Sequence, residues 1–185
     1  MIISITGTPS TGKTTVAREL AHMLGYDLVS LNELVKAGKI KATWDKKRKT
    51  WIVNEDYIDA EISKYLDRNK NYVIEGGLGH FIKSSLCVIL RTNPKVLEKR
   101  MKQRDWEENK IQENIQAEIL DAIVIEARDI NDTVIEVDTS RRTPKSTAIL
   151  IKQIVDNHRQ KFYKAGKIDW SEKYIKYLTK DKEVE

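Results

Sequence analysis

The residues with the clearest chemical potential form the pattern Gly-x-x-x-x-Gly-Lys-Thr between Gly7 and Thr14. Gly7 and Gly12 permit backbone conformations that other residues rarely adopt, so successive N–H groups can point toward one centre. An apolar run precedes the pattern and a helical pattern follows it, which is the context that a phosphate-binding loop requires. In such a loop Lys13 reaches the β- and γ-phosphates of a nucleoside triphosphate, and the Thr14 hydroxyl is a ligand of Mg²⁺. The alternative is a glycine turn that caps an ordinary helix.

A carboxylate, Glu75, ends a second apolar run at residues 72–75. In phosphate-loop proteins a carboxylate at this place holds Mg²⁺ or its waters, whereas the alternative is a solvated acid at a strand end. Gly76 and Gly77 follow, and both allow a substrate to approach the backbone closely. A plain turn would explain the same two glycines.

Two arginines, Arg100 and Arg104, lie four positions apart on a predicted helix and therefore share one face. The short polar segment after Arg104 leads into a long helix and is a candidate lid. Phosphoryl transfer needs positive charge against the phosphate oxygens and a segment that excludes water, and two arginines at the entry of a lid meet both needs. Surface salt bridges with Glu98 or Glu108 are the alternative.

The other candidates are weaker. Lys36 follows the second predicted strand, where it could grip the phosphate of a second nucleotide, although a solvated lysine is the commoner case. His80 could polarise a water or a substrate phosphate. Asn114 and Glu118 lie four apart on the long helix and are candidates to pack against the lid or the nucleotide. No group of residues has zinc-site spacing, and nothing supports a serine or thiol nucleophile.

Length and composition are those of a globular domain with a charged surface. The 185 residues fit one domain, 40% of them are hydrophobic and 33% are charged. No apolar run approaches the roughly 20 residues that span a bilayer, and no secretion signal is recognisable, so we expect no membrane partner. The single cysteine, Cys87, lies in an apolar strand, where a buried thiol is expected. It cannot form a disulfide within the chain, which agrees with a cytoplasmic location. The net charge of +5 is compatible with binding nucleotides or RNA.

Apolar periodicity predicts strands at residues 2–6, 26–30, 72–75, 86–91 and 134–137, and helices at 13–24, 31–37, 54–66, 94–104, 107–130 and from Pro144 onward. Five short strands separated by helices indicate a three-layer α/β fold with a five-stranded parallel sheet. Ligands of such sheets bind at the carboxyl ends of the strands. The phosphate loop, Ser30, Glu75 and Arg91 are therefore expected along one rim.

Residues 39–53 are irregular, and they form either a small hairpin or an ordered loop. A basic run, Lys46-Lys47-Arg48-Lys49, lies there between Trp44 and Trp51. It could contact RNA or a protein partner, although a solvated loop is the commoner explanation of four successive charges. The Lys-rich residues 163–185 are amphipathic in patches.

Several blocks together resemble one family. They are residues 7–15, Leu90-Arg91-Thr92, Val96-Leu97-Glu98-Lys99-Arg100, Arg104 and Asn114-Ile115-Gln116-Ala117-Glu118. The chain resembles the small adenylate kinases of the isoenzyme-six group, also known as coilin-interacting nuclear ATPases or Fap-type ribosome assembly factors, in an archaeal-like form. The likeness covers about residues 1–160.

The resemblance implies a single P-loop nucleoside monophosphate kinase domain over residues 1–185, with a monophosphate-binding segment at about 30–53, a lid at about 103–113 and a basic tail at about 163–185. It implies Mg²⁺-dependent phosphoryl transfer from ATP to AMP and other monophosphates, together with ATPase activity. It further implies a role in late maturation of the small ribosomal subunit, through a ribosomal protein of the S-eleven family. On this resemblance ATP is bound by Ser10, Gly12, Lys13, Thr14, Thr15 and Arg104, and we add Thr11 of the same loop. From the residues themselves we expect the monophosphate to contact Ser30, Lys36, Gly76 and Gly77. The residues that we expect to be catalytic are Lys13, Glu75 and Arg104.

The chain departs from the family pattern at two places. Most relatives have Asp-x-His at the end of the third strand, whereas this chain has Glu75-Gly76-Gly77, so the histidine is absent unless His80 replaces it. Lys36 stands where larger adenylate kinases hold AMP with an arginine, and a lysine lacks the bidentate fork. The competing hypothesis is therefore an ATP-driven assembly factor whose kinase reaction is incidental.

Overall fold

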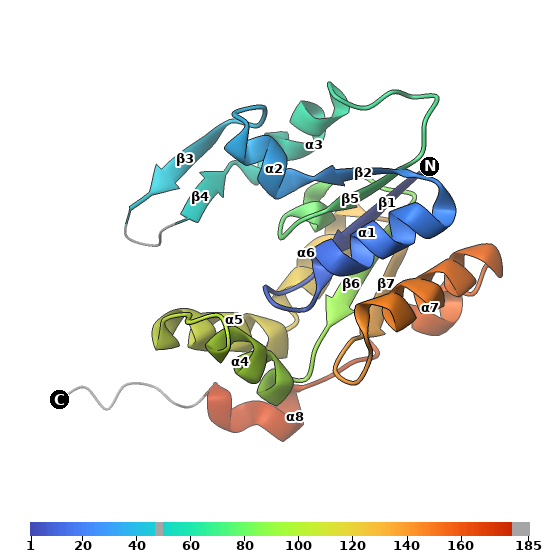
Figure 1. Ribbon diagram of the computed structural model, residues 1–185. Helices are drawn as coiled ribbons and strands as arrows, with labels where there is room; N and C mark the ends of the chain where they lie inside the picture. Colours follow the sequence, from blue (N-terminus) through green and yellow to red (C-terminus); the bar gives the residue numbers. More distant parts are fainter. Residues whose placement is uncertain (47–49, 179–185) are drawn as a thin grey trace.

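The computed structural model describes residues 1–46 and 50–178. Its centre is a parallel sheet with the strand order β2-β5-β1-β6-β7 (Figure 1). The strands are β1 (Ile2–Thr6), β2 (Asp27–Ser30), β5 (Tyr72–Glu75), β6 (Leu86–Arg91) and β7 (Val134–Asp138). Every pairing in the sheet is parallel. The predicted five-stranded α/β sheet is thus confirmed, with β2 beginning one residue later than expected.

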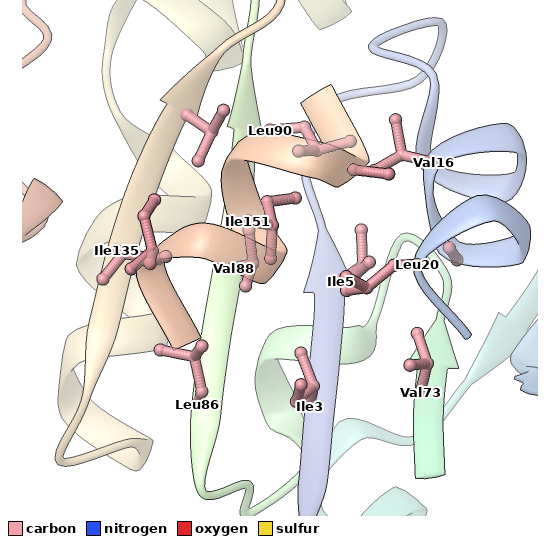
Figure 2. Packing of buried hydrophobic residues seen from close by; sticks show 14 of the residues in the cluster. Ile3, Ile5, Val16, Leu20, Val73, Leu86, Val88, Leu90, Ile135 and Ile151 are labelled. Atoms are coloured by element: carbon pink, nitrogen blue, oxygen red, sulfur yellow. The ribbon is translucent and has the colours of Figure 1, made fainter. Parts of the chain in front are cut away.

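Helices cover both faces of the sheet because alternate strand residues point to opposite sides. On one face α1 (Lys13–Leu24) and α7 (Pro144–Asp156) pack against the strands, and Figure 2 shows Val16, Leu20 and Ile151 meeting Ile3, Ile5 and Val88. On the other face α6 (Ala122–Ile130) packs on β6 through Val124 and Ala127. The short helix η1 (Gly79–Phe81) lies between β5 and β6 in the chain.

The segment between β2 and β5 forms a separate lobe beside the sheet (Figure 1). It contains α2 (Leu31–Lys36), the strands β3 (Ala42–Asp45) and β4 (Thr50–Val53), and α3 (Glu55–Ser63). The strands pair antiparallel with Trp44 opposite Trp51, so the hairpin, one of the two alternatives expected here, is the observed structure. Lys46 is the last described residue of the basic run, whose remaining residues, 47–49, lie outside the described residues. Asn54 caps α3, since its side chain accepts the N–H of Asp56.

The prediction of one long helix at 107–130 is wrong. The segment forms two helices, α5 (Glu108–Ile119) and α6, separated by Asp121 in a left-handed conformation with φ of 56°. The break lets α5 pack on α4 (Pro94–Lys102) while α6 packs on the sheet. Helical periodicity continued through the junction, but a straight helix could not have buried both apolar faces.

The chain ends with η2 (Gln160–Tyr163), α8 (Ser171–Tyr174) and η3 (Ile175–Tyr177). Residues 163–178 pack on the molecule: Ala165 donates its N–H to the carbonyl of Val134, and Tyr174 is buried against α4 and α5. Residues 179–185 of the predicted tail lie outside the described residues. Among the described residues, no helix is long and apolar enough to cross a membrane.

Candidate phosphate-binding site

The loop between β1 and α1 has the geometry that its glycines predict. Gly7 has φ of 138°, and a Cβ there would lie 2.4 Å from the carbonyl oxygen of Leu90, so no other residue fits. Gly12, with φ of 101°, stands at the N-cap of α1. Ser10 has φ of 70°, which is unusual for a residue with a side chain. The loop therefore curls around the amino end of α1, where backbone N–H groups and the helix dipole favour an anion.

Lys13 lies over this loop rather than in open solvent. Its Nζ donates to the carbonyl of Gly7 at 2.8 Å and to that of Thr8 at 3.1 Å. Burial lowers the pKa of Lys13 from 10.5 to about 8, and the nearby Glu75 and Glu118 oppose that shift. The charge of Arg104 adds to the lowering. The site thus holds an ammonium group that is poorly solvated and gains strongly from an anionic ligand.

One polar atom of the loop is left without a partner. Ser10 Oγ is buried and has no hydrogen-bond partner in the described structure. Buried hydroxyl groups are normally paired, so the atom is suited to a ligand oxygen. Thr14 and Thr15, at the start of α1, are exposed, whereas the Thr11 side chain is buried and donates to the carbonyl of Thr8 at 2.9 Å.

Glu75 at the end of β5 faces the start of α1. Its Oε2 accepts the Thr14 hydroxyl at 3.0 Å, and its Oε1 accepts the Ser30 hydroxyl at 2.6 Å. A hydroxyl and a carboxylate that converge next to a phosphate loop are oxygen ligands of the kind that Mg²⁺ takes. No group of three His, Cys, Asp or Glu side chains in the described part of the chain could hold a metal ion. The pair therefore fits an ion that receives its other ligands from phosphate oxygens and water.

The residues predicted to bind the monophosphate differ in what they contact and in how exposed they are. Ser30 lies in the site but directs its hydroxyl to Glu75, and it makes no side-chain cap to α2. Gly76 is buried, and a Cβ there would lie 2.9 Å from the side chain of Leu31, so packing alone requires this glycine. Gly77 has open space on its Cα, as close approach of a ligand would need. Lys36 is exposed on α2.

Arg100 contacts the phosphate loop. Its guanidinium donates to the carbonyl of Thr139 at 2.9 Å and to that of Ser10 at 3.4 Å. Glu98 and Glu108, the partners in the salt-bridge alternative, both pair with Lys102. Arg104 follows α4 and is exposed, with its N–H bonded to the carbonyl of Met101.

The His80 side chain is enclosed by protein atoms. Its side chain is 2% exposed, with Nδ1 3.0 Å from Thr6 Oγ1 and Nε2 2.9 Å from Glu126 Oε2. Burial lowers the pKa of His80 to about 4, and the charge of Lys13 adds to the effect. Both ring nitrogens are engaged by protein atoms, so the expectation that His80 polarises a water or a phosphate is wrong for this arrangement.

One other expectation, the position of Arg91, needs correction. Arg91 was expected on the ligand rim, but its side chain is 1% exposed and pairs with Glu118, Asp121 and Glu136. Glu118, a candidate to pack against the lid or the nucleotide, contacts the phosphate loop, since its Oε2 accepts the Thr8 hydroxyl at 2.5 Å. The sequence carries no signal for this contact, because the two residues lie 110 positions apart. Asn114 bonds within its own helix, to the carbonyl of Lys110.

Cys87 is buried as expected, and burial raises its pKa to about 11.

Solved structures of other proteins share this fold. The shikimate kinase from Acinetobacter baumannii in complex with shikimate superposes with a TM-score of 0.63 at 19% identity, over 85% of this chain and 94% of that one. The deoxyadenosine kinase from M. mycoides with bound dATP gives 0.52 at 16% identity, over 84% and 100%. At these identities the likeness concerns the fold alone.

The sequence comparisons are more specific. Residues 3–121 match the family described as AAA domain. Archaeal proteins with the name "Putative adenylate kinase" match nearly the whole chain. That of Thermococcus kodakarensis is 36% identical over 178 residues (96% of this chain and 97% of the relative). That of Pyrococcus furiosus is 38% identical over 181 residues (96% and 97%). That of Methanocaldococcus jannaschii is 31% identical over 179 residues (97% and 98%). The chain therefore belongs to the AAA domain family and to the family of these archaeal proteins.

Proposed function

We propose that the protein is a nucleoside monophosphate kinase that transfers the γ-phosphoryl group of ATP to AMP and related monophosphates, and that it also hydrolyses ATP. The observation that carries this proposal is the convergence of Lys13, Thr14 and Glu75 on one phosphate loop. The names of the archaeal relatives support a nucleotide substrate. The narrower assignment to the isoenzyme-six type stays a prediction from the sequence.

Each residue of the site has a part in this reaction. The loop N–H groups and the Ser10, Thr11, Gly12 and Thr15 positions bind the phosphates of ATP. Lys13 stabilises the negative charge that is shared by the β- and γ-phosphates during transfer. Thr14 and Glu75 hold Mg²⁺, which when bound neutralises charge on the phosphate oxygens. Arg104 reaches the triphosphate from a lid at about 103–113, which excludes water.

The acceptor side is proposed on the lobe that follows β2. Residues of about 30–53, with Ser30 and Lys36, and the glycines Gly76 and Gly77 would bind the monophosphate. Of the two glycines, Gly77 is better placed to contact the monophosphate, because the space beside its Cα is open. The space beside the Cα of Gly76 is occupied by the Leu31 side chain. The proposed arrangement is a single domain over residues 1–185.

A coupled assay tests the proposal by comparing ADP formation from ATP plus AMP with that from ATP alone. AMP should stimulate ADP formation, and Lys13→Met should reduce it by about a hundredfold or more, because a preorganised charge on the transferred group is lost. Lys95→Met, at an exposed position of α4, is the matched control and should retain wild-type activity. If no monophosphate stimulated the reaction, only the ATPase would remain.

We further propose, as a second function, a role in the late maturation of the small ribosomal subunit in the cytoplasm. The observation that favours it is the β3–β4 hairpin, where Trp44 and Trp51 are 46% and 44% exposed with ring centroids 5.2 Å apart. Exposed large aromatic side chains are suited to a protein or RNA partner. The expected partners are a ribosomal protein of the S-eleven family and the 16S-type rRNA.

The second function predicts that a ribosomal protein is retained from cell extract and released upon ATP hydrolysis. The variant Trp44→Ala/Trp51→Ala should lose this retention while it keeps the hydrolysis of ATP alone, a reaction that does not use the monophosphate-binding segment. A Lys13→Met strain should accumulate precursor small-subunit rRNA. Normal rRNA processing in that strain would argue against the assembly role and leave the kinase proposal unaffected.

A further inference from the structure

Glu118, near the end of α5, joins the lid side of the molecule to the phosphate loop. It is 3% exposed, and both carboxylate oxygens have donors. Oε2 accepts the Thr8 hydroxyl at 2.5 Å, and Oε1 accepts Arg91 Nε at 2.8 Å and the N–H of Thr92 at 3.0 Å. One side chain of α5 is thus bonded to the loop that follows β1 and to the end of β6.

Arg91 holds Glu118 in place. Nε and Nη2 donate to the carboxylate and to the backbone carbonyl of Glu118 at 2.8 Å each, and Nη2 also donates to Asp121 at 2.5 Å. Nη1 donates to Glu136 and to the carbonyl of Ile168. These five bonds match the five N–H donors of a guanidinium. The Arg91 guanidinium therefore bonds to protein groups in the interior, and these bonds fix the last turn of α5 at its carboxyl end.

Thr8 is the point at which this cluster meets the reacting group. Its backbone carbonyl accepts Lys13 Nζ at 3.1 Å, the Thr11 hydroxyl at 2.9 Å and the Thr11 N–H at 3.3 Å. The Thr8 side chain that Glu118 holds and the carbonyl that holds Lys13 belong to the same residue. A shift of Glu118 therefore moves the carbonyl that orients Lys13.

We propose that Glu118 is a positioning residue that acts on Lys13 through Thr8 and so couples the placement of α5 to the phosphate loop. This inference rests on the proposed function of the site. The helix α5 begins inside the proposed lid segment and ends at Ile119, directly after Glu118, so it is one rigid element between the lid and Glu118. Each placement of the lid is thereby linked to one placement of Lys13.

The test uses Thr8→Val, which removes the hydroxyl and keeps the shape, and Thr8→Ser, which restores the hydroxyl. Thr8→Val should lower kcat/KM for ATP by about 10- to 100-fold, the cost expected when a reacting group is misplaced by up to an ångström. The KM for AMP should stay unchanged. Thr8→Ser should return kcat/KM to the wild-type range, and Glu118→Gln should reduce it in the same direction as Thr8→Val.

Thr147→Val is the matched control. Thr147 is also a buried threonine, on α7, and its hydroxyl donates to the carbonyl of Thr143 at 2.9 Å. The Thr147→Val variant should be less stable than the wild type, with an unchanged kcat/KM. The inference is wrong if Thr8→Val alters only the melting temperature, as the control does, or if Thr8→Ser fails to rescue. If the wild type made no ADP from ATP and AMP, the kinase proposal would fail, while ATP affinities of the same series, measured by calorimetry, would still decide the role of Glu118.

Discussion

At the scale of single residues, Lys13 has the most unusual environment in the site. Its ammonium is held by two loop carbonyls and is poorly solvated, and burial lowers its pKa to about 8. Phosphate oxygens stabilise the charged form, so the pKa must rise when a triphosphate binds. A group whose pKa rises on binding takes up a proton, which makes binding depend on pH.

We therefore predict that ATP binding is coupled to proton uptake. The uptake should be small at pH 7, where Lys13 is already charged, and large at pH 8.5. Above about pH 8 the affinity for ATP should fall by up to tenfold per pH unit. Calorimetry in HEPES and in Tris, which differ in ionisation enthalpy, measures the uptake at each pH. Equal proton counts at pH 7 and 8.5 would contradict the prediction, and Lys95→Met should behave as the wild type.

The free protein should show the opposite trend in stability. The folded pKa of Lys13 is below its unfolded value of 10.5, so the unfolded chain binds more protons between about pH 8 and 10.5. The contribution of this group to the free energy of unfolding therefore rises with pH in that window. It should disappear in Lys13→Met, which denaturant titrations at pH 8 and 10 would reveal.

At the scale of elements, α4 and α5 form a small core of their own with the carboxyl-terminal segment. Leu97 and Met101 of α4 and Ile111 and Ile115 of α5 pack around Tyr174, which is 4% exposed. The Tyr174 hydroxyl donates to Asn93 Oδ1 at 2.8 Å, and that same oxygen caps α4 by accepting the N–H of Lys95. The carboxyl-terminal segment therefore braces both helices that flank the proposed lid.

Substitutions of Tyr174 should measure this brace. Tyr174→Ala should cost about 3–5 kcal/mol of the free energy of unfolding, as removal of a buried aromatic ring does. Tyr174→Phe, which removes only the hydroxyl, should cost about 1 kcal/mol. Urea titration gives both values. Tyr57→Ala, at a side chain that is 64% exposed, is the control and should change stability by less than about 0.5 kcal/mol. An equal cost at both tyrosines would mean that residues 163–178 do not brace the helices.

At the scale of the whole molecule, Arg91 joins parts of the chain that are distant in sequence. Burial by itself lowers the pKa of Arg91, but the attraction of Glu118, Asp121 and Glu136 outweighs it and raises the pKa. The second oxygen of Glu136 accepts the N–H groups of Gly166 and Lys167 at 2.6 and 3.0 Å. The cluster thus connects β6, β7, the α5–α6 junction and the carboxyl-terminal segment.

Removal of the Arg91 charge should lower the free energy of unfolding by an amount that depends on pH. Arg91→Met should cost about 3–5 kcal/mol at pH 7, because it leaves buried carboxylates without a partner. The loss should be smaller at pH 5, since unpaired buried carboxylates have raised pKa values and become neutral by taking up protons. Thermal unfolding of both proteins at pH 5 and 7 gives the comparison, with Arg68→Met at an exposed position as the control. A loss that is equal at both pH values would show that charge is not the cause.

Local patterns were sufficient to predict the sheet and the phosphate loop. The Gly7 to Thr14 spacing and the apolar runs of the strands act over a few positions, so their consequences can be read along the chain. Lys13, Thr14 and Glu75 could be assigned to one rim because parallel strands bring their carboxyl ends together. This reasoning places the end of a strand, but it does not say whether a side chain there faces a ligand or the interior.

The remaining features depend on contacts between distant residues, which periodicity does not encode. Ser30 bonds Glu75 rather than its own helix because β2 lies next to β5. Arg91 turns inward because three carboxylates from later elements meet it. The helix breaks at Asp121 since α5 and α6 bury their apolar faces against different partners. A sequence determines which face of each element is apolar, whereas only the folded chain decides which buried charge meets which partner.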